Sequence, residues 1–182
     1  MTRIYTIGHS KHTLEKLVQL LKDNGVTMLV DVRTAPYSRF CPWFNKDDLE
    51  FELPRRQVQY QFAGKHLGGR PSDASLYKSH KIPEDEGVDY LHEVDYSEIM
   101  KRPWFEQAIE RLLETAEQEV VAILCSEENP ADCHRHHLIA RYLLEYYPEV
   151  EIVHIRGDGV TFGAASIHKS VDKPAATQTT MF

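Results

Sequence analysis

The sequence predicts an α/β fold: a doubly wound, mainly parallel sheet with helices on both faces, followed by a flexible C-terminal tail. Two runs, VTMLVDVR and VVAILC, are almost continuously apolar, which is typical of strands buried on both faces of a parallel sheet. The chain also opens as strand, helix, strand, and this order favours a right-handed parallel crossover.

The first half of the chain supplies the opening crossover and a third strand. RIYTIG is a β-rich run that ends at the turn Gly8-His9-Ser10. A helix follows, with Thr13 as its N-cap and Gly25 as its stop, and VTMLVDVR is the next strand. A short helix is expected over about residues 46–53, and VQYQF alternates like a strand. KHLGGRPSD indicates a loop, and residues 72–95 form a long polar connection of the kind that often carries function.

The second half repeats the alternation of helix and strand. PWFEQAIERLLETAEQ carries apolar residues at helical spacing, and CHRHHLIARYLLEYYP is a helix that proline ends. EIVHIR is the last expected strand. We expect one domain over residues 1–168 and a disordered tail over residues 169–182, because the tail is polar and lacks periodicity.

The composition indicates the cellular compartment and excludes some classes of partner. The three cysteines are odd in number and too few for a disulfide framework, which indicates a reducing cytoplasm. The N-terminus lacks a signal-peptide core, and no apolar run approaches the roughly 20 residues that span a bilayer, so we expect no membrane partner. The net charge of -7 excludes a generally DNA-coating surface. Residues 33–81 are nevertheless basic, with nine Lys/Arg against five Asp/Glu, and could line a site for an anionic substrate.

Polar side chains follow four of the expected strands. They are His9, the pair Asp31 and Arg33, the pair Cys125 and Glu127, and Arg156. In parallel sheets, ligands bind at the carboxyl ends of strands, so these residues should converge on one crevice.

The stretch CSEENPADCHRHH, residues 125–137, admits a metal site, a redox pair or a catalytic pocket. Cys125 and Cys133 lie too far apart for the usual zinc spacing, and Cys-x-x-Cys is absent. We therefore expect no metal ligand and no cofactor. In a catalytic pocket, Glu127 would act as acid or base, while the role of the cysteines stays open. Alternatively, Cys125 is only a small buried hydrophobe and Arg135 pairs with Asp31.

The expected site residues fall into two groups. The catalytic candidates are Glu127, Cys125, Cys133, His134, Asp31 and His9. The anion-binding candidates are Arg33, Arg135, Ser38 and Arg70. Arginine suits the second role because its planar fork holds phosphate or carboxylate through two hydrogen bonds.

Five short segments, YTIGHS, LVDVRTAPYSRF, LGGR, LCSEENPADCHRHHLIA and VHI, resemble the domain of unknown function 488 family in order and spacing. The most specific is Cys-x-Glu-x5-Cys-His-Arg, and the likeness covers roughly residues 3–156. The resemblance implies that these polar positions form one pocket.

A looser likeness is to rhodanese domains, in which one strand ends in Asp-Val-Arg and a later strand ends in the catalytic cysteine. Residues 31–33 and Cys125 are similar to that arrangement. The loop after Cys125 is longer and acidic, however, and Glu127 and Glu128 would repel an anionic sulfur donor. Sulfur transfer is therefore the alternative rather than the main hypothesis.

The tail ends in QTTMF, which resembles the Gln-x-x-Leu-Phe peptide by which DNA polymerases and repair enzymes dock on the bacterial sliding clamp. Gln178 would hydrogen-bond at the mouth of a groove that takes Met181 and Phe182 as apolar anchors. We therefore expect a cytoplasmic enzyme that acts on a nucleotide or nucleic acid in DNA repair or modification. The competing hypothesis is a non-catalytic module that binds phosphate or a nucleotide.

The tail hypothesis predicts that the last five residues are needed for binding to the clamp but not for the stability of the domain. Deleting Gln178 to Phe182 should abolish binding to a sliding clamp from the same organism, measured by surface plasmon resonance, and should leave the melting temperature nearly unchanged. Clamp binding that is the same with and without these residues would rule the hypothesis out.

Overall fold

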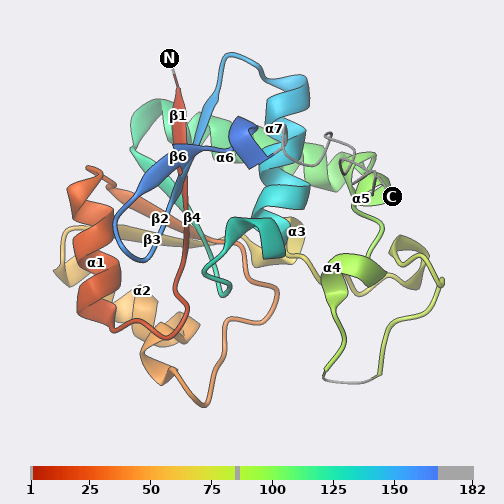
Figure 1. Cartoon of the computed structure of the whole chain (residues 1–182), viewed down its shortest axis with the longest axis horizontal. Coiled ribbons are helices and arrows are strands. Elements are labelled where there is room, and N and C mark those ends of the chain that lie inside the picture. The colour runs from red at the N-terminus through yellow and green to blue at the C-terminus, as the bar shows by residue number, and fades with distance from the viewer. Residues whose placement is uncertain (1, 85–86, 168–182) are drawn as a thin grey trace, which may run out of the picture.

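The sheet carries the architecture of the chain. The computed structural model describes residues 2–84 and 87–167, and these form a six-stranded sheet with strand order β3-β2-β4-β1-β5-β6 (Figure 1). The strands are β1 (Arg3–Gly8), β2 (Met28–Asp31), β3 (Gln59–Phe62), β4 (Val121–Cys125), β5 (Glu151–Ile155) and β6 (Thr161–Gly163). The first five run parallel, and β6 pairs antiparallel with β5. The predicted α/β fold with a mainly parallel sheet is confirmed.

Helices cover both faces of this sheet. The α-helices are α1 (Leu14–Asp23), α2 (Lys46–Arg55), α3 (Gly64–Leu67), α4 (Tyr90–Glu93), α5 (Tyr96–Met100), α6 (Pro103–Gln118) and α7 (Arg141–Tyr146). Single 3-10 turns are η1 (Pro42–Phe44), η2 (Ala74–Leu76) and η3 (Pro130–Asp132). Apolar residues of α1 and α2 form one core against the sheet, and those of α5, α6 and α7 form the other.

Helix α1 begins and ends where the sequence predicts. The Thr13 hydroxyl accepts a hydrogen bond from the Lys16 amide at 3.2 Å, which satisfies one free donor of the first turn. Gly25 follows the helix with φ of +68°, a left-handed conformation that glycine adopts without steric cost. These contacts confirm both predicted ends.

The helix expected to follow Cys133 has an unusual first part. Residues Arg135–Ala140 form a π-helical segment, η4, which continues directly into α7. His134 stands at its N-cap, so the polar residues of the motif occupy the start of the helix as predicted. A π turn is rare and often occurs at functional sites.

Four short elements differ from the sequence-based expectation. Residues 64–67 form α3 where a loop is expected, and the polar connection over residues 72–95 contains η2 and α4. The edge strand β6 is not predicted at all. Each element has three or four residues, which is too short for hydrophobic periodicity to reveal.

Strand register brings the predicted site residues to one edge of the sheet. In the parallel pairs, Gly8 lies opposite Cys125, and Asp31 lies opposite Leu124. The ends of β1, β2 and β4 therefore meet, as the sequence predicts. None of the helices in the described ranges has the length and apolar character needed to cross a bilayer.

Phe105 of α6 provides a test of this packing. It is fully buried and stands edge-on to Tyr142 with ring centroids 5.2 Å apart. Phe105→Ala should lower the free energy of unfolding by about 3–5 kcal/mol, because it leaves a cavity between helix and sheet. Phe40, which is 91% exposed, is the matched control. Phe40→Ala should change stability by about 0.5 kcal/mol or less in urea titrations, and equal effects of the two variants would contradict this packing.

Candidate functional site

A pocket of about 290 Å³ opens at the carboxyl ends of β2 and β4. Four segments form its wall: the loop after β2, the Gly69–Arg70 turn, the region of α4 and α5, and the loop from β4 to η4. The lining residues are Arg33, Thr34, Ala35, Tyr37, Gly69, Arg70, Val88, Asp89, Tyr90, Leu91, Tyr96, Cys125, Ser126, Glu127, Asp132, Cys133 and His134.

Two thiols, an imidazole and a carboxylate meet in this pocket. The Cys125 Sγ lies 3.5 Å from Oε2 of Glu127 and 3.5 Å from Nδ1 of His134. The Cys133 Sγ lies 3.9 Å from the same Nδ1. Both cysteines are buried, whereas Glu127 is exposed at the mouth. Burial raises the pKa of the Cys133 thiol, because desolvation penalises the thiolate, and the neighbouring Cys125 adds to this effect.

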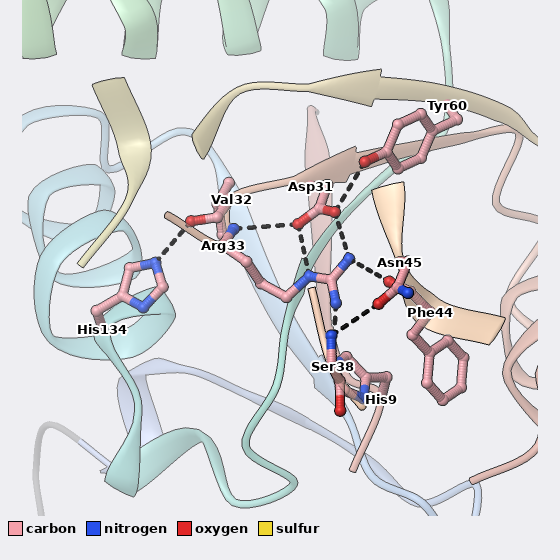
Figure 2. A network of polar contacts seen from close by, with 9 residues as sticks. All are labelled: His9, Asp31, Val32, Arg33, Ser38, Phe44, Asn45, Tyr60 and His134. Carbon is pink, nitrogen blue, oxygen red and sulfur yellow. Dashed lines mark hydrogen bonds and ion pairs between the residues drawn. The ribbon is translucent and has the colours of Figure 1, made fainter. Parts of the chain in front are cut away.

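The orientation of His134 is fixed from behind. Its Nε2 lies 3.1 Å from the carbonyl oxygen of Val32 and must donate a proton to it (Figure 2). In the neutral ring this leaves the lone pair of Nδ1 directed at the two sulfur atoms. Gly69 packs against the ring, and a Cβ at this position would lie 2.5 Å from Cγ of His134. This close approach explains why glycine occurs here in the LGGR segment.

Arg70 and Tyr90 form the outer wall. The Arg70 guanidinium lies over the Tyr90 ring, 4.3 Å from its centroid, and the side chain is exposed. Among the described residues, no carboxylate pairs with Arg70. Its side-chain N–H donors are therefore available to an anion, and the exposed ring of Tyr37 also lines the pocket.

Arg33, by contrast, is used inside the protein. It forms a buried two-point ion pair with Asp31, in which the Nε–Oδ1 distance is 2.9 Å and the Nη2–Oδ2 distance is 2.6 Å (Figure 2). It also donates to the Phe44 carbonyl at 2.7 Å and to His9 Nε2 at 3.2 Å. Tyr60 donates a further hydrogen bond to Asp31 at 2.8 Å. The network therefore fixes the loop after β2, and its partners occupy most of the donors that could hold an anion.

Arg135 is fully buried and holds the loop after β4. Its Nε donates to Thr6 Oγ1 at 3.2 Å, and its two terminal nitrogens donate to the carbonyls of Glu127 and Glu128. The partner of Asp31 is therefore Arg33, and the alternative pairing of Arg135 with Asp31 is wrong. Gly8 makes this arrangement sterically feasible, because a Cβ there would lie 1.7 Å from the Glu127 carbonyl oxygen.

A buried polar chain extends from Arg135 away from the pocket. Thr6 Oγ1 lies 2.7 Å from Nδ1 of His154, and Nε2 of His154 lies 3.1 Å from Nδ1 of His136. Burial lowers the pKa of His154 to about 3, with help from the neighbouring His136, Arg135 and Arg156. His154 is therefore neutral in the folded protein at neutral pH.

The structure brings some of the predicted residues to the pocket and places others behind it. Cys125, Cys133, His134, Glu127, Arg33 and Arg70 line the pocket. Behind the wall, His9 donates to the Ser10 carbonyl and accepts from Arg33, and burial lowers its pKa to about 4. Ser38 accepts the amides of Phe40 and Cys41 in its own turn. The observed contacts give these side chains structural roles. Two parts of the prediction are still untested: catalysis by His9 or Asp31, and anion binding by Arg33, Arg135 or Ser38.

Sequence reasoning missed several lining residues. They are Tyr37, Asp89, Tyr90, Tyr96 and Asp132. The available signal was the long polar connection, which contains Asp89 and Tyr90 and ends just before Tyr96.

Comparison with known proteins gives one result. A family model described as "Domain of unknown function DUF488" matches residues 13–143. The chain therefore belongs to the DUF488 family, as its motifs predict. No curated protein and no solved structure shows significant similarity to it.

The neutral buried His154 predicts acid sensitivity. The pKa of His154 is about 3 when folded and about 6.5 when unfolded, so protons favour the unfolded chain as the pH falls below about 6.5. This residue alone should remove about 2 kcal/mol of stability between about pH 7 and about pH 5. His154→Gln should flatten that dependence in urea titrations, whereas His92→Gln, with a side chain 78% exposed, should not. Identical pH profiles for all three proteins would refute the assignment.

Proposed function

We propose that this pocket is the active site of a cytoplasmic enzyme that acts on a nucleotide or a nucleic acid in DNA repair or modification. The observation that carries the proposal is the placement of Glu127 beside a thiol and an oriented imidazole, in a pocket that Arg70 and Tyr90 also line. A carboxylate, a thiol and a histidine lone pair supply an acid or base and a nucleophile or ligand.

The outer wall supports the choice of substrate class. Arg70 offers donors for a phosphate, and the exposed ring of Tyr37 offers a surface on which a base can stack. Asp89 and Asp132 also line the pocket, and carboxylates can accept hydrogen bonds from the amino groups of a base. A donor for phosphate, a ring for stacking and carboxylates for hydrogen bonds together fit a nucleotide better than a simple anion.

Recruitment to DNA is a separate part of the proposal. A chain with net charge of -7 gains little from general attraction to the phosphate backbone, so a tether to a DNA-bound partner would raise its local concentration. The peptide with Gln178, Met181 and Phe182 would provide that tether to a sliding clamp. These residues lie outside the described part of the chain, and this part of the proposal rests on the sequence.

The geometry does not favour sulfur transfer. The Glu127 carboxylate lies 3.5 Å from the Cys125 sulfur, where it would repel both a thiolate and an anionic sulfur donor. A binding module without chemistry is the remaining alternative, and Glu127 distinguishes it from an enzyme.

The enzyme hypothesis predicts that Glu127→Gln separates binding from turnover. The purified chain would be incubated with a panel of normal, damaged and modified nucleotides and short oligonucleotides, and products would be detected by mass spectrometry. Glu127→Gln should lower turnover by about 100-fold or more, because it removes the acid or base. Its affinity for the same compound, measured by calorimetry, should stay within about threefold. Unchanged turnover, or an absence of product with every compound, would reject the enzyme hypothesis.

Arg70 provides the control for substrate class in the same assay. Arg70→Ala should weaken the binding of the phosphorylated substrate by about tenfold, because one charge-assisted contact is lost. The matching nucleoside, which lacks phosphate, should bind wild type and variant equally. An equal loss for both compounds would mean that Arg70 supports the fold of the wall instead of binding phosphate.

A further inference from the structure

The donor set at the base of the pocket has a use beyond acid–base chemistry. Sγ of Cys125, Sγ of Cys133 and Nδ1 of His134 all lie within 4.8 Å of one another. They come from two separate elements, the end of β4 and the loop before η4, which the fold brings together. We propose that Cys125, Cys133 and His134 form a zinc site with an open fourth position that faces the pocket.

The distances fit tetrahedral zinc. With a Zn–S bond of about 2.3 Å and a Zn–N bond of about 2.1 Å, a sulfur and a nitrogen on one tetrahedral ion lie about 3.6 Å apart. The two sulfur–nitrogen distances here are 3.5 Å and 3.9 Å. Two sulfurs on the same ion would lie about 3.8 Å apart, and the three donor atoms here lie within 4.8 Å of one another. A zinc ion can therefore occupy the space between the three atoms once the two sulfurs approach each other by up to about 1 Å.

A hydrogen bond on the far side of the His134 ring leaves its Nδ1 free to bind a metal. A ligating histidine generally donates its other ring N–H to a carbonyl or carboxylate, which fixes the tautomer that binds metal. His134 does this through Nε2 to the Val32 carbonyl at 3.1 Å, and its Nδ1 lone pair is left for the ion. The backbone amide of Arg135 lies 3.5 Å from the Cys133 sulfur and would stabilise a metal-bound thiolate.

The donor atoms also suit a soft cation. The two thiols would bind it as thiolates, and the Glu127 carboxylate lies 3.5 Å from the Cys125 sulfur. The charge of the nearby Arg33 is balanced by Asp31. Two thiolates and one imidazole are soft and borderline donors, a combination that selects zinc over magnesium or calcium.

The fourth position gives the site its chemistry. Glu127 is exposed at the pocket mouth, with Oε2 3.5 Å from the Cys125 sulfur, so it can accept a proton from a water molecule bound to the ion. The hydroxide then stays on zinc, and the proton stays on the carboxylate until a leaving group takes it. Two cysteines, one histidine and a non-ligating glutamate are also the groups by which zinc deaminases act on nucleobases. The role of Glu127 rests on the proposed function, but the metal site does not.

The expectation of no metal ligand depended on the distance between the cysteines along the sequence. Zinc sites with short Cys-x-x-Cys spacing hold both sulfurs in one turn. In this chain the η3 turn and its flanking residues return the backbone to the strand end instead, which the spacing alone does not reveal.

Metal content tests the proposal directly. The full chain would be purified under reducing conditions from zinc-supplemented medium, dialysed against a weak chelator and assayed by mass spectrometry. About one zinc per chain is expected. Cobalt added to the metal-free chain should give the intense visible bands of a tetrahedral ion and a thiolate charge-transfer band. Failure of the wild-type chain to bind either metal would overturn the proposal.

Matched variants locate the ligands. Cys125→Ser, Cys133→Ser and His134→Gln should each lose the bound zinc and the charge-transfer or tetrahedral signature. Cys41→Ser should retain both, because Cys41 is also buried but lies outside the cluster. Circular dichroism would check that each variant folds. The wild-type melting temperature, with and without zinc, gives a readout that needs no variant, and the absence of any rise would count against the site.

Glu127→Gln tests the open position. This variant should keep about one zinc per chain, and azide should perturb its cobalt spectrum, because the fourth position still accepts an external ligand. Loss of zinc from this variant would make Glu127 a ligand and refute the open position. If the chain binds no zinc but Glu127→Gln still abolishes turnover, the metal site falls and the proposed enzyme stands. If the chain binds zinc but turns over no nucleotide, the metal site stands and the proposed enzyme falls.

Discussion

The buried guanidinium of Arg135 is the contact on which the rest of the site depends. Its donors go to Thr6 in β1 and to the carbonyls of Glu127 and Glu128, so one side chain fixes the centre of the sheet and the loop after β4 together. A charge with no exposure to solvent is costly to leave without partners. The loop therefore has one favourable position, and that position sets where Glu127 can reach.

A second buried arginine performs the equivalent task one strand away. Arg33 is held by Asp31 and by the Phe44 carbonyl, and it fixes the loop after β2. The pocket lies between these two supported loops. A site built from loops can therefore be pre-organised, because the two buried arginines hold those loops in place. Arg70 on the outer wall is left to bind a substrate.

The sequence predicts the fold well because its signals are long. Apolar runs such as VVAILC define buried strands, and parallel strands bring His9, Asp31 and Cys125 to one edge. The roles of Arg33 and Arg135 could not be predicted. An arginine at the same place in the sequence can donate its hydrogen bonds either to a substrate or to a backbone carbonyl. Only the folded contacts decide this. The short elements α3 and β6, and the meeting of Cys125 with Cys133, depend in the same way on tertiary structure that no local pattern records.

The π-helical segment η4 determines how the pocket residues before it are oriented relative to the core residues after it. His134 and Arg135 at its start face the strand ends, whereas Tyr142 and Leu143 of α7, beyond it, pack in the core. A π turn closes its hydrogen bonds over five residues where an α-helical turn closes them over four, so η4 holds one residue more than a regular α-helix in the same span. Loss of one residue from η4 would therefore restore a regular α-helix and leave both sets of residues on their faces, whereas loss of one residue from α7 would turn the chain beyond it by about 100°. Among related chains, one-residue deletions should consequently be tolerated in η4 and not in α7.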